Sequence, residues 1–133
     1  MTCVLQIPRD GDVAPGSAWS QMERILGFGN INITQSAVST IAYKIFMPGA
    51  SSVIQSGTLL KTSVIFDTLQ TTSLDAEWTE DAIGYNFKNT WTGVQTPPEG
   101  KCYRYVVTIT DTSSRAYSFA RDRCASNFQS PVP

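Results

Sequence analysis

The sequence predicts an all-β fold, a single antiparallel β-sandwich of about seven strands. Hydrophobic residues make up 41% of its 133 residues and charged residues only 16%, and threonine and serine recur in strand-like alternations. Turn signals built from Gly, Pro, Asn, Asp and Ser return about every 8 to 12 residues, which is typical of a sandwich. A chain of this length suits one domain with its own core.

The clearest element is a β-hairpin in residues 101–123, with the sequence KCYRYVVTITDTSSRAYSFARDR. Opposed residues of an antiparallel pair point to the same face, so the correct register should match apolar with apolar side chains. A single register does this, and a slip by one residue would set the apolar stripe against threonines. We therefore predict a loop of Thr112, Ser113 and Ser114 and a core-facing stripe. The opposed pairs are Ile109 with Tyr117, Val107 with Phe119, and Tyr105 with the stem of Arg121.

The same register sets Cys102 opposite Cys124 at the open end of the hairpin. The two could form a cross-strand disulfide or remain two reduced thiols. We favour reduced thiols, because the odd count of three cysteines is not that of a secreted disulfide scaffold and the N-terminus MTCVLQIPRDGD lacks a signal peptide. The chain has no His and no Cys-x-x-Cys spacing, so neither a metal site nor a cofactor is expected.

The remaining segments follow from local patterns. Residues 1–16 open with the alternating piece TCVLQI and continue into a Pro, Asp and Gly-rich stretch, which we interpret as an N-terminal arm. Within it, Asp10-Gly11-Asp12 resembles the start of a calcium loop but lacks the later oxygens, so we predict a turn. Residues 17–124 form the sandwich, and residues 125–133, with two prolines, form an irregular tail.

Within the sandwich, strands are predicted where apolar and polar residues alternate. Residues 17–26 fit a helix or a strand equally well, and Gly57 is a candidate bulge or bend. Residues 70–83 are polar and too long for a hairpin loop, so we expect an exposed crossover. Strands are predicted at residues 40–47, 52–60, 62–69 and 84–91, with a short alternating piece at 30–34.

Composition excludes several function classes. The absence of His removes Ser-His-Asp and Cys-His nucleophiles and the commonest general base at neutral pH. The net charge is −1 and the basic residues are scattered, so no nucleic-acid partner is expected. No apolar run approaches the roughly 20 residues of a membrane helix, so no membrane partner is expected.

Two groups of residues are candidates for a functional site. Four carboxylates, Asp75, Glu77, Glu80 and Asp81, could hold a glycosidase pair, although carboxylates crowded in an exposed loop are usually only solvated. Three aromatic residues beside them, Trp78, Tyr85 and Trp91, could form an exposed stacking platform for a sugar or another interaction surface. The alternative is that these large aromatic side chains belong to the core.

Parts of the chain resemble known families. The segment YRYVVTITDTSSRAYSF is similar to the closing strands of bacterial and phage immunoglobulin-like modules. The succession ITQSAVSTIAYKIF, VIFDTLQT, WTEDAIGYNF and YRYVVTIT resembles a family of uncharacterised β-rich proteins of tailed phages and prophages, and the strand-turn-strand opening resembles the N-terminal domain of baseplate upper proteins. The resemblance implies a virion component and supplies no catalytic residues.

Three functions from different classes remain open. The first, which we favour, is a non-enzymatic structural protein of a tailed-phage particle, either a capsid decoration protein or a neck, tail or baseplate component. It would be made in the host cytoplasm, would not be secreted, and would bind capsid or tail subunits as an oligomer or as part of a larger assembly. The second is a carbohydrate-binding or adhesion module of immunoglobulin type, and the third is a small glycoside hydrolase.

Overall fold

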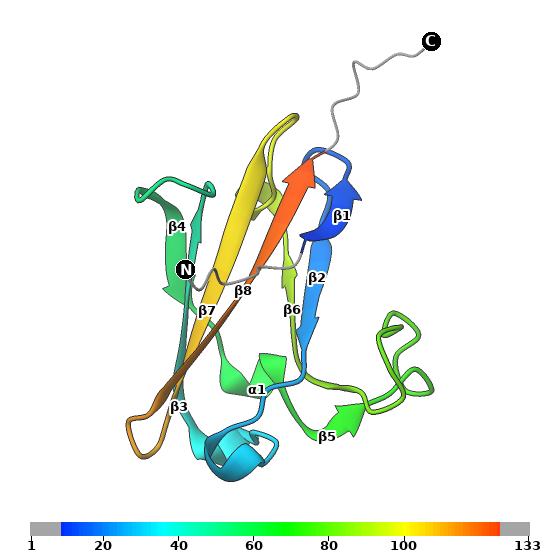
Figure 1. Cartoon of the computed structure of the whole chain (residues 1–133), viewed down its shortest axis with the longest axis vertical. Coiled ribbons are helices and arrows are strands. Elements are labelled where there is room, and N and C mark those ends of the chain that lie inside the picture. Colours follow the sequence, from blue (N-terminus) through cyan, green and yellow to red (C-terminus); the bar gives the residue numbers. More distant parts are fainter. Residues whose placement is uncertain (1–8, 126–133) are drawn as a thin grey trace, which may run out of the picture.

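Eight strands build two facing sheets in the computed structural model, which describes residues 9–125 (Figure 1). The larger sheet has the order β1-β8-β7-β3-β4, and the smaller has the order β2-β6-β5. The predicted fold class, an all-β sandwich, is thus confirmed. The strands are β1 (Arg9–Val13), β2 (Trp19–Glu23), β3 (Val38–Phe46), β4 (Val53–Thr58), β5 (Ile65–Gln70), β6 (Tyr85–Trp91), β7 (Cys102–Asp111) and β8 (Ala116–Ala125).

Helical structure in the described residues is limited to short turns. The helix α1 (Lys61–Val64) is a single turn before β5, and three 3-10 turns lie at Phe28–Asn30, Gln35–Ala37 and Gly93–Gln95. Within residues 9–125 no helix is long and apolar enough to cross a membrane.

The C-terminal hairpin has the predicted register. Strand β7 pairs antiparallel with β8 from Cys102 opposite Cys124 to Thr110 opposite Ala116, and the loop lies where it was predicted. Tyr105, Val107 and Ile109 are fully buried, whereas Tyr117 and Phe119 are partly buried against the core. The alternation of side chains along a strand explains why the sequence alone was sufficient here.

The preference for two reduced thiols was wrong, because Cys102 and Cys124 form a disulfide. The pairing register brings the two residues face to face, and Cys124 is almost fully buried. The covalent link therefore closes the open end of the hairpin. Cys3 lies outside the described residues.

The described part of the predicted N-terminal arm joins the larger sheet. Residues 9–13, where a turn was predicted at Asp10-Gly11-Asp12, form strand β1, which pairs with β8 in parallel. This is the one parallel pairing among the described strands, and all the other strand pairs are antiparallel, as the sequence predicts. The first half of the arm, including the TCVLQI piece, and residues 126–133 of the predicted tail lie outside the described residues.

Strand β2 resolves the ambiguity of residues 17–26. It pairs antiparallel with β6, so that Trp19 lies opposite Trp91 and Gln21 opposite Asn89. Trp19 and Gln21 are buried in alternation, and the Gln21 Oε1 accepts a hydrogen bond of 3.0 Å from the indole N–H of Trp91. This partner is what permits a polar side chain at a core position.

The middle of the chain differs from the prediction at two points. The strand predicted at residues 62–69 is present as β5, but it begins at Ile65, because residues 61–64 form α1. The segment of residues 70–83 is not a crossover between sheets, because β5 and β6 are antiparallel neighbours in the smaller sheet. Residues 71–84 therefore form a long excursion that leaves the edge strand β5 and returns to the same sheet at its central strand β6.

Gly57 does not mark a bulge. The irregularity between β3 and β4 lies between Ile45 and Phe46, opposite Gln55 and Val53. A Cβ atom at Gly57 would come within 2.9 Å of the ring of Tyr43. Glycine at this position therefore permits the close approach of an aromatic ring from the neighbouring strand.

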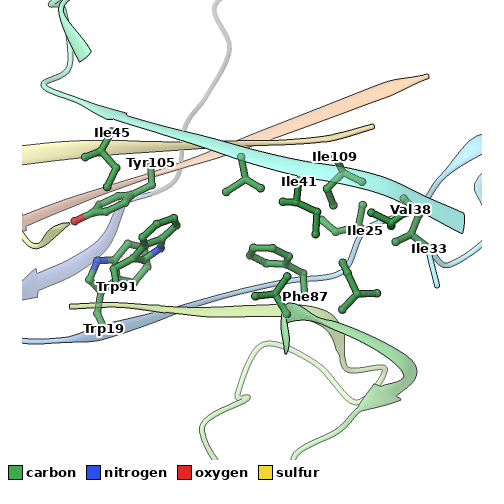
Figure 2. Close-up of a cluster of buried hydrophobic side chains, with 13 residues drawn as sticks. Trp19, Ile25, Ile33, Val38, Ile41, Ile45, Phe87, Trp91, Tyr105 and Ile109 are labelled. Atoms are coloured by element: carbon green, nitrogen blue, oxygen red, sulfur yellow. The ribbon is translucent and has the colours of Figure 1, made fainter. Parts of the chain in front are cut away.

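The core fills the space between the two sheets (Figure 2). Ile41 and Ile45 from β3 and Tyr105 and Ile109 from β7 extend towards Trp19, Phe87 and Trp91 from the smaller sheet, as Figure 2 shows. The aromatic rings pack closely, with Trp91 and Tyr105 centroids 5.1 Å apart and Trp19 and Tyr105 centroids 4.9 Å apart.

Candidate functional site

The three aromatic residues predicted as an interaction surface are buried. Trp78, Tyr85 and Trp91 have exposed fractions of 5%, 2% and 0%. Trp91 packs between Tyr43 and Tyr105 in the core. A stacking platform needs an exposed ring face, so the prediction of an exposed surface made by these residues was wrong, and their structural alternative was correct.

Trp78, in the 71–84 excursion, and Tyr85, at the start of β6, form a small second aromatic cluster. Their ring centroids are 5.5 Å apart, and Phe66 packs edge-on against Tyr85. The indole N–H of Trp78 donates to the main-chain oxygen of Asp81 at 2.9 Å. The excursion is therefore fixed by an aromatic anchor of its own.

The acidic residues fix the same excursion by ion pairs. Asp75 accepts hydrogen bonds from the Tyr85 hydroxyl and, at 2.8 Å, from the Lys88 ammonium, which also donates to Glu77 at 2.7 Å. These contacts, led by the Lys88 hydrogen bond, lower the pKa of Asp75 to about 2. Burial and the neighbouring Asp75 carboxylate raise the pKa of Tyr85.

Asp81 has a similar role at the other end of the excursion. It accepts from the Gly84 N–H at 3.0 Å and from the Arg24 guanidinium at 2.8 Å, and these contacts lower its pKa to about 2. A glycosidase acid needs a raised pKa, so neither Asp75 nor Asp81 has the electrostatics of one. Glu80 is exposed.

A groove of about 530 Å³ runs between the excursion and strands β2 and β8. Arg121 lines it, but its guanidinium makes a bidentate ion pair with Glu23, with N–O distances of 2.7 and 2.9 Å. Arg123 covers the ring of Trp19 at 4.2 Å. Among the described residues no cluster of His, Cys, Asp and Glu could hold a metal ion.

A different surface emerges at the end of the sandwich where three connections meet. It is formed by the β2–β3 loop (residues 24–37), the β4–β5 connection (residues 59–64) and the β7–β8 turn (residues 111–115), and we call it the loop end. In Figure 1 these segments lie together at the bottom of the molecule. The Thr112 N–H donates to the Ala37 oxygen at 3.0 Å, and the Lys61 ammonium donates to the Val38 oxygen at 2.8 Å.

The buried side chain of Asn86 holds the base of the β2–β3 loop. Its Oδ1 accepts from the Ile25 N–H at 2.7 Å, and its Nδ2 donates to the oxygens of Ile25 and Ile33 at 3.0 and 3.2 Å. The Ile33 N–H also donates to the Ile25 oxygen at 3.1 Å. One amide therefore joins both ends of the loop to strand β6.

Above this base, the chain turns tightly through Gly29 and Asn30, whose φ angles of 77° and 59° lie in the left-handed region. Gly and Asn are the residues that adopt this conformation at the lowest cost. The turn leaves Phe28 and Ile31 projecting from the loop, each 69% exposed. Leu60 in the β4–β5 connection is 72% exposed at the same end.

Asp111 organises the β7–β8 turn. Its carboxylate accepts from the N–H groups of Ser113 and Arg115 at 2.8 and 2.9 Å, from the Arg115 Nε at 2.9 Å and from the Tyr117 hydroxyl at 3.1 Å. Burial acts to raise the pKa of Asp111, but these hydrogen bonds outweigh it and hold the pKa at about 2. The turn is thus ordered by one charged side chain.

The β7–β8 turn and the β2–β3 loop touch through a cation–π contact. The Arg115 guanidinium lies 4.1 Å from the centroid of the Phe28 ring. Beside it is a hollow of about 250 Å³ with a mainly apolar lining, which includes Phe28, Ile31, Ile33 and Ala37. The loop end therefore presents exposed apolar side chains on ordered backbone.

The loop end was not predicted from the sequence. Its local signal is the segment Gly27-Phe28-Gly29-Asn30, where an aromatic residue lies between two glycines and is poorly suited to either a helix or a strand. The partners of Phe28 come from residues 111–115, far along the chain, so their proximity depends on the strand order.

Comparison with known proteins gives no relatives. No family model, curated protein or solved structure matches this chain.

Proposed function

We propose that this chain is a non-enzymatic structural protein of a tailed-phage particle that acts through protein–protein contacts made by the loop end. The observation that carries the proposal is the set of exposed apolar side chains on the three connections, with Phe28 and Ile31 each 69% exposed and Leu60 72% exposed. Exposed apolar side chains on an ordered surface are typical of protein-binding sites.

The order of the loop end supports this role. The Asn86 and Asp111 hydrogen bonds hold two of its three connections before any partner binds. A surface that is already ordered loses little conformational entropy when it binds. The Arg115 guanidinium over the Phe28 ring adds a planar cation to the apolar patch, and both residue types are enriched at interfaces.

We also propose that the sandwich is of immunoglobulin type. Its sheets have the order β1-β8-β7-β3-β4 and β2-β6-β5, which matches the variable-type arrangement if the strands are lettered A′, B, C, C′, D, E, F and G in chain order. In addition, the Tyr105 hydroxyl near the start of β7 donates to the Gln95 oxygen at 2.6 Å, as a tyrosine corner does. In variable domains, loops of the corresponding end bind ligands.

The assignment to a phage particle is carried by the sequence resemblance, which is an associational argument. The Cys102–Cys124 disulfide is compatible with it. Disulfides persist at virion surfaces and are rare in the cytosol, so a protein made in the host cytoplasm would acquire this bond after the particle is released. Capsid or tail subunits are the proposed partners.

Cross-linking of purified particles tests the proposal. Particles from the source strain should contain this chain, and cross-links should join residues 24–37 or 111–115 to a capsid or tail subunit. The double variant Phe28→Ser and Ile31→Ser should remain folded and be lost from the particles, because both side chains are exposed and contribute little to stability.

Val94→Ser is the matched control. Val94 is 72% exposed and lies in the turn at Gly93–Gln95, at the opposite end of the sandwich. The control should enter particles as the unchanged protein does. If the double variant is incorporated normally, or if the chain is absent from the particles, the proposal is wrong.

A further inference from the structure

Within residues 9–125, the outer edge of strand β4 has backbone groups without a hydrogen-bond partner. Leu59 lies opposite Ile41 in the β3–β4 ladder, and its N–H donates to the Ile41 oxygen at 2.9 Å, so these two residues form a hydrogen-bonded pair. Hydrogen-bonded and non-hydrogen-bonded pairs alternate along an antiparallel ladder. The residues at positions 58 and 56 therefore belong to non-hydrogen-bonded pairs, and Ser56 and Thr58 direct their N–H and C=O groups away from β3. No hydrogen bond between described residues reaches these groups.

This edge also lacks the usual protection against pairing. Residues 50–60 read ASSVIQSGTLL and contain no charged residue and no proline. Natural edge strands are commonly blocked by Lys, Pro or inward-pointing charges. The one irregularity lies between Gln55 and Val53, so the ladder from Gln55 to Thr58 is regular.

The other edge strands of the described structure differ from β4 in this respect. Strand β1 contains Arg9, Asp10 and Asp12, and β2 ends at Glu23. Strand β5 contains Asp67, whose carboxylate accepts from the Gln35 N–H at 2.7 Å. Among these edges β4 alone is uncharged, and it exposes two adjacent large apolar side chains, Val53 at 45% and Ile54 at 40%.

We propose that β4 pairs antiparallel with β4 of a second copy of this chain, joining two larger sheets into one. A two-fold axis at Ser56 sets that residue opposite itself, Ile54 opposite Thr58 and Val53 opposite Leu59. No like charges meet in this arrangement, and the exposed apolar residues at one end of each strand gain a partner. The pairing is independent of the proposed binding by the loop end.

The experiment is sedimentation velocity of the full chain over a wide concentration range. The unchanged protein should show a concentration-dependent dimer. Ser56→Pro removes the outward N–H but no bond to β3, and Ser56→Lys sets two like charges opposite each other. Because the symmetry applies each change twice, the dimer dissociation constant should rise by about tenfold or more.

Ala116→Lys is the matched control. Ala116 is exposed and lies on β8, three strands away from β4 in the same sheet, so the same change there should leave the dimer intact. Circular dichroism establishes that each variant is folded, and Ser56→Lys retains the backbone if Ser56→Pro does not fold. Hydrogen exchange at the Ser56 and Thr58 amides should slow as the concentration rises.

Three results would overturn the proposal. The first is a monomer at every concentration, and the second is a dimer that both Ser56 variants leave unchanged. The third is a dimer that Ala116→Lys dissociates, which would assign the contact to the surface around Ala116 instead. Hydrogen exchange at the Ser56 and Thr58 amides that does not slow as the protein concentration rises would also show that β4 is not the dimer contact.

Discussion

Asn86 is the residue on which the shape of the loop end depends. It is 1% exposed, and its amide makes three hydrogen bonds to the main chain of Ile25 and Ile33. In Asn86→Ala those buried groups lose their partner, so we expect the free energy of unfolding to fall by about 2 to 4 kcal/mol. Denaturant unfolding measures this loss.

Asn89→Ala, in the same strand, is the comparison for Asn86→Ala. No hydrogen bond to the Asn89 side chain is found among the described residues, so Asn89→Ala should lower the free energy of unfolding by no more than about 0.5 kcal/mol. Equal losses in the two variants would contradict the anchoring role of Asn86.

Asp75 gives a prediction for acid stability. Its folded pKa of about 2 lies below the ordinary value of 3.8, so it stabilises the folded protein above pH 3.8, and that contribution disappears as the pH falls from 3.8 towards 2. Asp75→Asn should therefore lower the melting temperature at neutral pH and flatten the acid limb of the stability curve in that window. Asp81 and Asp111 also have lowered pKa values, so part of the acid limb should remain.

Thermal melts at a series of pH values measure this effect. Glu99→Gln, in an exposed turn, is the control and should follow the unchanged protein throughout. An Asp75→Asn variant with the same acid limb as the unchanged protein would show that the Lys88 and Tyr85 contacts do not stabilise the fold.

At this scale the sequence could reveal residue types but not their partners. Asp75, Glu77 and Asp81 were visible as an acidic group, yet their role depends on distant cations. The excursion folds back so that Asp75 and Glu77 meet Lys88 on β6, and the pairing of β2 with β6 brings Arg24 near Asp81. Trp78, Tyr85 and Trp91 were visible as aromatic residues. Whether such rings are covered depends on the packing of the whole excursion, which no local pattern encodes.

Among the elements, the β5–β6 connection depends on a single glycine. Gly84 has a φ of 104°, and a Cβ atom there would lie 2.6 Å from the Gln70 oxygen. Gly84→Ala adds both backbone strain and a steric clash with main-chain atoms, so we expect a loss of about 2 to 4 kcal/mol in unfolding free energy.

Gly100→Ala separates those two contributions in the same unfolding measurement. Gly100 has a φ of 74° but no atom within 4 Å of the added Cβ, so only the strain of about 1 kcal/mol should appear. If the two variants lose equal stability, the close approach of Gln70 is not what requires glycine at position 84.

The hairpin disulfide stabilises a second element. Cys102 and Cys124 are separated by 22 positions in sequence, and closing a loop of this size restricts the unfolded chain by about 3 kcal/mol. The double variant Cys102→Ala and Cys124→Ala should unfold at lower denaturant concentration yet keep the β7–β8 register, because nine opposed pairs define it. Chemical denaturation with and without reductant measures the loss, and an unchanged midpoint would contradict it.

Some strands and turns were predictable because their own sequence specifies them, whereas others depend on contacts with distant segments. The hairpin and β3 were predictable, because alternation over nine or ten residues fixes both extended structure and facing. Strand β1 was not, since its sequence RDGDV has turn propensity and becomes extended only through pairing with β8. Residues 61–64, which form a helical turn in the connection from the larger sheet to the smaller one, were not predictable either.

For the whole molecule, the continuous core predicts a single cooperative transition. Trp19 and Trp91 lie in this core, while Trp78 belongs to the 71–84 excursion and is buried there. If the excursion unfolds with the core, tryptophan fluorescence and far-ultraviolet circular dichroism should give coincident unfolding curves. An earlier fluorescence change that is absent in Trp78→Phe would instead show that the excursion opens independently.

Fold class was the property that the sequence determined best, because composition and turn spacing are averaged over the whole chain. The loop end was beyond reach, since it joins residues 24–37 with residues 111–115 through the strand order of both sheets. The order of strands in a sandwich depends on long-range pairing, and the alternation of residues within each strand does not specify which strands pair.

The parallel pairing of β1 and β8 has a mechanical consequence. The described chain enters β1 at Arg9 and leaves β8 at Ala125, and because the strands run in the same direction these points lie at opposite ends of the pair. Tension between the two ends would pull along the strands and load their hydrogen bonds together, in shear. Near the end of β8, where force would enter at Ala125, the Cys102–Cys124 disulfide joins β8 to β7. The force is therefore passed on to β7 in the larger sheet, and β8 is not peeled away from it.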